Sequence, residues 1–267
     1  MTIIAIIAAR NEELYLERCI RHLRSQGILT CIINHGSTDR TRHIAESFMD
    51  DGVCRIVDEE YCESFDLFAM LRLKERLSLE MEADWFIHCD ADEIREAPQP
   101  YATLREGIEA ADLAGYNAIN FEEFVFIPTA DSDRYEGTDY VQKIKHYYYF
   151  SPSPLRRVNA WKKTQDVDLA TSAGHHVRFE NQRIFPTNFI LRHYIILSAE
   201  HGRMKYGFNR KFLPTASSLR EWHGWRARFK QEMIKLPPPA ELKKYFGDRV
   251  WDCSDPKTRH IFIQDTM

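Results

Sequence analysis

The stretch Trp85-Phe86-Ile87-His88-Cys89-Asp90-Ala91-Asp92-Glu93 joins a short apolar run directly to a group of carboxylates. A run of this length that leads into polar residues is typical of a strand buried on both faces of a sheet. In the turn that follows, Asp90 and Asp92 can direct their carboxylates at one hard cation, and such oxygen ligands suit Mg²⁺ or Mn²⁺. An acidic turn or a helix cap could use the same residues, but their position after a buried strand favours a metal site.

Strand and helix patterns alternate on both sides of this stretch. Apolar runs predict strands at residues 3–8, 30–34, 54–57 and 85–89. Helical periodicity predicts helices at residues 16–23, 70–81 and 104–111, and a further helix is expected to start at Ser37-Thr38-Asp39. This alternation predicts an α/β fold with a mostly parallel central sheet flanked by helices. Ligands of such sheets bind at the carboxyl ends of the strands, where two more polar clusters follow predicted strands. These clusters are Arg10-Asn11-Glu12-Glu13, in which Asn11 can cap the next helix, and Asn34-His35-Gly36-Ser37-Thr38-Asp39-Arg40-Thr41, in which Ser37 or Thr38 can do so.

The second half of the chain has a less regular pattern. We expect one long strand or a pair of strands at 116–127, a polar loop at 131–137 and a strand at 190–196. Helices are expected at 199–212 and 219–235, and the second ends at three consecutive prolines. The aromatic residues 147–150 could stack on sugar rings or fill the core.

Three motifs in this order resemble family 2-like glycosyltransferases of the GT-A fold, in particular the bacterial subgroup with an R-N-E start and a D-x-D-E motif. They are Ile7-Ala8-Ala9-Arg10-Asn11-Glu12-Glu13, the cluster from Asn34 to Thr41, and Asp90-Ala91-Asp92-Glu93. The likeness covers residues 1–95 and continues more weakly through Gly174-His175-His176, Arg192-His193-Tyr194 and Trp222-His223. It implies a GT-A domain at 1–213, with a nucleotide-binding half at 1–95 and an acceptor-binding, metal-completing half at 96–213. A helical C-terminal extension at 214–267 would pack on this domain.

The resemblance also implies roles for single residues. Asn34 occupies the position at which this family usually has an acidic residue that reads the base, so the identity of the nucleotide stays open. A histidine from the C-terminal part often completes the metal site, and His193 is our first choice, with His175 and His176 as alternatives that could instead bind the acceptor. Lys205 and Arg210 could hold the diphosphate, or could be ordinary helix charges. The expected nucleotide-binding residues are Ala8, Arg10, Asn11, Glu12, Asn34, Asp39 and Asp90, and the expected metal ligands are Asp90, Asp92 and His193.

An inverting transferase needs a base within hydrogen-bond reach of the acceptor hydroxyl. Glu122 and Glu123 follow a predicted strand, and alternation along a strand would direct only one of them inward. We expect this to be Glu123, which would act as a catalytic residue beside Asp92. Asp131 and Asp133 follow the next strand and are alternatives, and a retaining enzyme of this fold needs no such base.

The composition limits the partners and the cellular location that we expect for the protein. A net charge of −4 over 267 residues gives no global attraction to nucleic acid. The apolar run Ile3 to Ala9 is too short to span a bilayer and has no basic residue before it, so we expect a cytoplasmic protein. The basic amphipathic stretch Arg220 to Lys235 could touch the inner face of the membrane, as would suit a lipid-linked acceptor. The six cysteines form no C-x-x-C pair, which argues against a structural zinc site.

The sequence therefore predicts a glycosyltransferase that depends on Mn²⁺ or Mg²⁺ and moves a sugar from a nucleotide-diphosphate donor to a glycan, lipid or small-molecule acceptor. One alternative is a nucleotidyltransferase that makes a nucleotide sugar, although the loop after the first strand lacks the glycines such an enzyme should have. Another alternative is a glycan-binding module of the same fold without catalytic activity.

Overall fold

A computed structural model describes residues 1–61, 66–132, 134–209 and 229–264. These residues form two compact units that interleave along the chain. Unit 1 contains residues 1–60, 67–123 and 153–193, and unit 2 contains 61–66, 124–152 and 194–267. The chain leaves unit 1 and returns to it, and the expected domain division at residue 213 stays a prediction.

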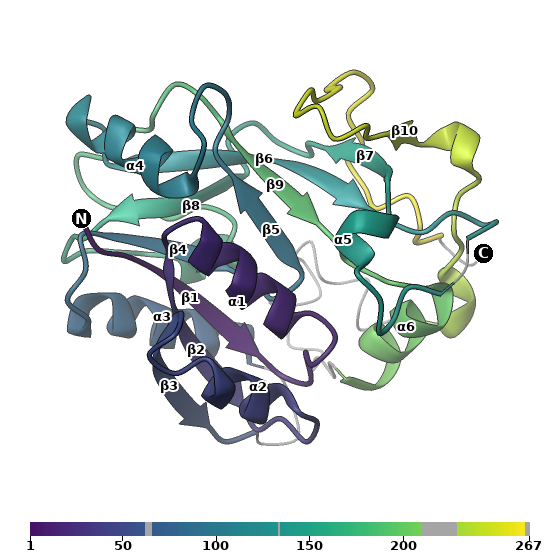
Figure 1. The fold of residues 1–267 in the computed structure, drawn as a ribbon, viewed down its shortest axis with the longest axis horizontal. Helices are drawn as coiled ribbons and strands as arrows, with labels where there is room; N and C mark the ends of the chain where they lie inside the picture. Colours follow the sequence, from purple (N-terminus) through teal and green to yellow (C-terminus); the bar gives the residue numbers. More distant parts are fainter. Residues whose placement is uncertain (62–65, 133, 210–228, 265–267) are drawn as a thin grey trace. The chain divides into compact units, whose positions relative to one another are not determined.

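The first part of unit 1 is a parallel sheet built from four strands (Figure 1). Its order is β4-β1-β2-β3, and every neighbouring pair is parallel. The register sets Ala9 beside Asn34 and Asn34 beside Asp58, so the polar residues that follow these strands share one edge. The strands are β1 (Ile3–Ala9), β2 (Leu29–His35), β3 (Val53–Glu59) and β4 (Trp85–Cys89).

Antiparallel strands complete the sheet, which is therefore mixed rather than mostly parallel. β8 (Arg157–Lys162) pairs with β4, and β6 (Ala118–Phe126) pairs with β8. The Asp90-Ala91-Asp92 turn, hereafter the D-A-D turn, leads into β5 (Glu93–Glu96), which pairs antiparallel with β9 (Phe189–His193). The α/β prediction is confirmed, but local patterns did not indicate these antiparallel pairings because they join segments far apart in the sequence.

Four helices flank the sheet of unit 1. The predicted stripe of α3 packs against alternate residues of β1 and β2 in a core that includes Met70, Leu77, Ile4, Ile6 and Ile33. On α1 the buried residues Leu16, Cys19, Ile20 and Leu23 recur at the expected helical spacing, and α1 contacts β2 and β5. The helices are α1 (Leu16–Ser25), α2 (Thr41–Ser47), α3 (Leu67–Glu80) and α4 (Leu104–Leu113), and a 3-10 turn η1 lies at Ala170–Ser172.

Unit 2 has an aromatic interior. Trp251 stacks on Tyr245 with ring centroids 4.7 Å apart and lies 4.5 Å from Phe124, and Phe126 stacks on Tyr147 at 5.3 Å. We call these five residues the aromatic cluster. The elements of this unit are α5 (Tyr140–Lys143), β7 (His146–Phe150), α6 (Ala199–Met204), the π-helix η2 (Lys205–Asn209), the 3-10 turns η4 (Gln231–Met233) and η5 (Pro239–Glu241), and β10 (Lys243–Lys244).

Several expectations for the second half change. The strand expected at 190–196 ends at His193, and the helix expected from 199 becomes a π-helix at Lys205. Residues 210–228, including Arg210, Trp222 and His223, lie outside the described residues, as does Asp133. The described part of the stretch from Arg220 to Lys235 contains a 3-10 turn rather than an α-helix. None of the helices in the described ranges has the length and apolar character needed to cross a bilayer.

Candidate functional site

The loops after β1 and β2 are joined by hydrogen bonds. Arg10 Nη1 donates to the carbonyl oxygens of His35 and Gly36, at 3.0 and 2.5 Å. Thr38 N donates to Asn11 Oδ1 at 2.8 Å. Arg10, Asn11, Glu12 and Asp39, four of the predicted nucleotide-binding residues, are therefore joined in one hydrogen-bonded network. The amides of Asn11, Glu12 and Glu13 donate to Ser37 Oγ, Thr41 Oγ1 and Asp39 Oδ2 at 3.2, 2.7 and 3.1 Å.

Two expected helix caps in these loops are wrong. Helix α1 begins at Leu16, too far along the chain for Asn11 to cap it, and Asn11 instead adopts a positive φ of 54°. At the start of α2, the capping acceptor is neither Ser37 nor Thr38. Asp39 Oδ1 accepts from Thr41 N at 2.9 Å, and its other oxygen accepts from Glu13 N. Asp39 therefore accepts hydrogen bonds from the backbone of both loops.

The amide of Asn34 is tied into the neighbouring strand. Its Nδ2 donates to Asp58 Oδ1 at 2.8 Å, and its Oδ1 accepts from Ser37 N at 3.3 Å. Arg42 Nε also donates to Asp58, at 2.9 Å. The hydrogen bond from Asn34, despite partial desolvation and together with Arg42, lowers the pKa of Asp58. A carboxylate thus stands beside the position at which the resemblance led us to expect one.

The two aspartates of the D-A-D turn have different surroundings. The side chain of Asp90 is 41% exposed, whereas that of Asp92 is 5% exposed. The turn is held from inside by Glu93, whose Oε2 accepts from Asp90 N at 3.0 Å and pairs with Arg95 at 2.5 Å. Arg95 also lies over the ring of Phe121, 4.5 Å from its centroid. A buried ion pair therefore fixes the backbone that carries the two aspartates.

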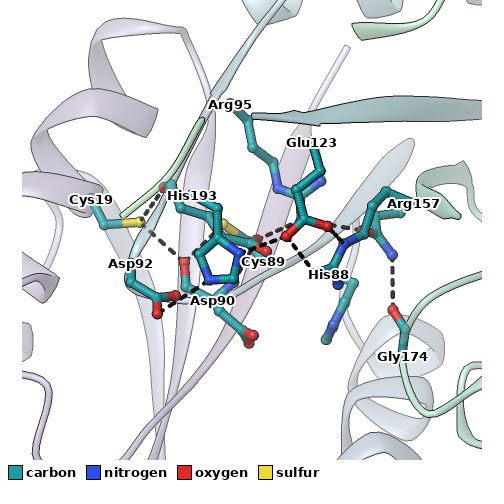
Figure 2. A network of polar contacts seen from close by, with 12 residues as sticks. Cys19, His88, Cys89, Asp90, Asp92, Arg95, Glu123, Arg157, Gly174 and His193 are labelled. Atoms are coloured by element: carbon teal, nitrogen blue, oxygen red, sulfur yellow. Dashed lines mark hydrogen bonds and ion pairs between the residues drawn. The ribbon is translucent and has the colours of Figure 1, made fainter. Parts of the chain in front are cut away.

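His193 lies between two carboxylates (Figure 2). Its Nε2 is 3.4 Å from Asp92 Oδ2 and its Nδ1 is 2.7 Å from Glu123 Oε1. This contact arises because the β5–β9 register places His193 opposite Glu93, next to the turn. Burial disfavours the charged imidazole, but the charges and hydrogen bonds of Asp92 and Glu123 outweigh burial and raise the pKa of His193 to about 9.

Asp92 and His193 have the chemistry of a cation site. Two ligands of one octahedral cation lie about 3 Å apart when each is about 2.1 Å from the metal, close to the observed separation. Ligating histidines commonly place their second ring nitrogen on a carboxylate, as His193 does on Glu123. These residues fit a divalent cation, which would replace the proton on Nε2. Within the described part of the chain, no three His, Cys, Asp or Glu side chains are already gathered around a common point.

Glu123 is in a poor position to act as a base. Arg157 donates to Oε2 of Glu123 at 2.8 Å and to Oε1 at 3.1 Å, and His193 contacts Oε1. Burial alone would raise the pKa of Glu123, yet the charge of Arg157 and the contact with His193 hold this pKa well below its usual range. As strand alternation predicts, Glu123 is buried and Glu122 is only half-buried. The geometry, however, favours an orienting role toward His193 over the expected role as general base.

The two remaining histidine candidates lie apart from the D-A-D turn. Nδ1 of His175 is 3.1 Å from Arg157 Nη1, and its Nε2 is 3.4 Å from Arg156 Nη2. Two neighbouring guanidinium groups disfavour a cation at His175. The ring nitrogens of His176 lie 3.1 Å from the Leu155 carbonyl and 3.3 Å from Gln182 Oε1. The structure thus brings His193, not the doublet, to Asp92.

Lys205, for which we considered a role as a diphosphate ligand or as an ordinary exposed helix charge, is buried. It is 4% exposed, and its Nζ donates to the Ile195 carbonyl at 3.0 Å within unit 2. Lys205 is the first residue of the π-helix η2. Its expected partner Arg210 lies outside the described residues.

Sequence reasoning missed two polar residues beneath the D-A-D turn. Lys74 is 1% exposed on the inner side of α3, and its Nζ donates to His88 Nδ1 at 3.0 Å. Burial and the charge of Lys74 lower the pKa of His88 well below its ordinary value, so the ring is neutral. The available signal was a lysine within the apolar stripe of α3, next to Leu73 and three residues before Leu77.

Comparison with known proteins adds a family match over part of the chain. Residues 4–61 match the model described as glycosyl transferase family 2. No curated protein matches the chain in sequence. The solved structures similar to it include TarS 1–349 of S. aureus, with 10% identity, 73% of this chain and 60% of that chain covered, and a TM-score of 0.41.

Two further similar structures contain nucleotide ligands. TarS 1–349 of S. aureus in complex with UDP shares 10% identity over 85% of this chain and 68% of that chain, with a TM-score of 0.41. A UDP-glucose pyrophosphorylase complexed with UDP-glucose shares 8% identity over 66% of this chain and 73% of that chain, with a TM-score of 0.29. The protein thus spans 60% of the TarS 1–349 chain in the first match and 41% of the longer TarS chain.

Proposed function

We propose that this protein is a glycosyltransferase that uses a nucleotide-diphosphate sugar and a divalent cation, Mn²⁺ or Mg²⁺. The observation that carries the proposal is the contact of Asp92 with His193 at the end of β4. This pair shares unit 1 with the linked loops after β1 and β2, and those loops lie within the segment that matches the glycosyl transferase family 2 model.

Each group has a role that follows from its surroundings. Asp92 and His193 would hold the cation, with Asp90 as a further oxygen ligand or as a partner of the ribose. A bound cation neutralises the charge that builds up on a departing diphosphate. Glu123 orients His193 and is itself fixed by Arg157. The loop residues Arg10 to Glu12, with Asn34 and its partner Asp58, would surround the nucleoside.

The test begins with thermal unfolding of the purified protein against UDP, GDP, ADP, CDP and dTDP, with and without Mn²⁺. A ligand that binds only the folded state raises the melting temperature by mass action. We expect one nucleotide to give a shift that requires Mn²⁺ and disappears in Asp92→Asn. Turnover of the corresponding sugar donor then separates a transferase from a glycan-binding module, and release of pyrophosphate from a nucleoside triphosphate would identify a nucleotidyltransferase instead. Near-normal turnover by Asp92→Asn would exclude the proposed cation site.

A further inference from the structure

Helix α3 buries a lysine beside the apolar core of unit 1. Lys74 is 1% exposed, and the residues around it on α3, Met70, Leu71, Leu73 and Leu77, belong to the hydrophobic core of unit 1. Removing an ammonium group from water is costly unless the protein supplies partners that compensate for it. The partners of Lys74 therefore indicate what the residue does.

All three polar contacts of Lys74 lie at the end of β4. Its Nζ donates to His88 Nδ1 at 3.0 Å and to the Cys89 carbonyl at 3.2 Å, and it lies 4.0 Å from Asp90 Oδ1. His88 is confined from the other side by Gly174, where an added Cβ would lie 3.0 Å from its Nε2. Lys74 is thus held firmly at the start of the D-A-D turn.

Each carboxylate around the turn has a cationic partner from the chain. Asp92 lies beside His193, Glu93 pairs with Arg95, and Glu123 pairs with Arg157. The pair of Asp90 and Lys74 is looser than the others, because the Lys74 Nζ lies 4.0 Å from Asp90 Oδ1 and the side chain of Asp90 is 41% exposed. Asp90 is therefore exposed to solvent on one side and lies close to the buried amine of Lys74 on the other. Burial lowers the pKa of Lys74, and the neighbouring charges of Asp90 and Glu93 oppose this shift and favour the ammonium form.

This charge acts oppositely on the two components of the proposed ligand. An ammonium group close to Asp90 repels a divalent cation and attracts a diphosphate. We propose that Lys74 is a positioning residue that makes the D-A-D turn bind a divalent cation together with a nucleoside diphosphate rather than alone. This inference rests on the proposed function, and it assigns to Lys74 the coupling between the two ligands.

The test uses Lys74→Met, which keeps the length of the side chain and removes its charge. Calorimetry measures the affinity for the nucleoside diphosphate that gives the largest Mn²⁺-dependent shift in the panel above, and the EPR signal of free Mn²⁺ measures binding of the metal alone. We expect nucleotide affinity in the presence of Mn²⁺ to fall about tenfold, as loss of one charge interaction implies, while Mn²⁺ alone binds at least as tightly as to the wild type. Destabilisation of the fold would weaken both affinities and could not produce this split.

Leu77→Val is the matched control, because it loosens the same core of α3 one turn away without touching the polar contacts. It should leave both affinities unchanged. The inference about Lys74 would be overturned, and the proposed function left standing, if Lys74→Met bound the nucleotide with wild-type affinity. Weaker binding of both ligands by this variant would have the same consequence. A wild-type protein that binds neither Mn²⁺ nor any nucleotide of the panel would overturn the proposed function, and this inference with it.

Discussion

The residues beneath the D-A-D turn of unit 1 and the aromatic cluster of unit 2 fill buried space in opposite ways. The first region uses ion pairs: Arg157 with Glu123, Arg95 with Glu93, and Lys74 near Asp90. The second region uses stacked rings, such as Trp251 on Tyr245. Buried ion pairs add little net stability compared with apolar residues of similar volume, whereas aromatic contacts contribute directly. The comparison indicates that unit 1 gives up stability to fix the positions of charges, as a binding site requires.

The largest expected effect is that of Glu123→Gln. This change leaves the buried Arg157 guanidinium without its compensating charge, and removal of one partner from a buried pair costs about 4 kcal/mol of unfolding free energy. Urea unfolding would measure the loss. The control is Glu122→Gln on the same strand, whose half-buried side chain contacts Asn188 and should cost less than about 1 kcal/mol. Equal costs for the two variants would contradict the stabilising role of the buried pair of Glu123 and Arg157.

The free energy of unfolding of the metal-free protein should change with pH by nearly as much as it changes in Glu123→Gln. The folded-state pKa of His193 is about 9, whereas its ordinary value is 6.5. The stabilisation of the fold by protonated His193 is therefore fully present below pH 6.5 and is lost as the pH rises through 9. The linked loss is about 3 kcal/mol. Urea unfolding in EDTA at pH 6.5 and 9 would measure it, and His193→Asn should remove most of this slope. If the free energy of unfolding changes equally with pH in the wild type and in His193→Asn, another group is responsible for the change.

A smaller effect is expected from Trp251→Ala in the aromatic cluster. The ring is half-buried, stacks on Tyr245 and makes a tilted contact with Phe124, so its removal should cost about 2 kcal/mol, less than for a fully buried tryptophan. The neighbouring Val250→Ala is the control, because Val250 is 67% exposed and should tolerate the change. Both costs can be read from chemical unfolding, and a Trp251→Ala variant as stable as the control would refute the stabilising role of the cluster.

The smallest expected effect belongs to a polar contact of unit 2. Tyr148 Oη lies 2.8 Å from His260 Nδ1, and Tyr148→Phe removes this hydrogen bond while keeping the ring. A single neutral hydrogen bond contributes about 1 kcal/mol. A cost in urea unfolding as large as that of Glu123→Gln would mean that polar contacts matter equally in both regions.

The elements of the first half were predictable because their signals are local. Apolar runs and helical periodicity predicted β1, β2, β3 and β4 and the helices between them, since each pattern lies within one segment. The same locality explains the errors. The antiparallel strand β5 is only four residues long, and the strand before α6 ends at His193 because of pairing with β5 rather than because of its own sequence.

The sequence by itself determined the order of β1 to β4 and of the helices α1 to α4, and it placed the acidic turn after β4. The family resemblance made His193 the first choice among the histidines. Only the tertiary structure decided that Glu123 faces Arg157 and His193, which lie 34 and 70 residues further along the chain. It alone placed Lys74 beneath Asp90. Charge partners are set by strand register and helix docking, and these depend on the packing of the whole unit rather than on any one segment.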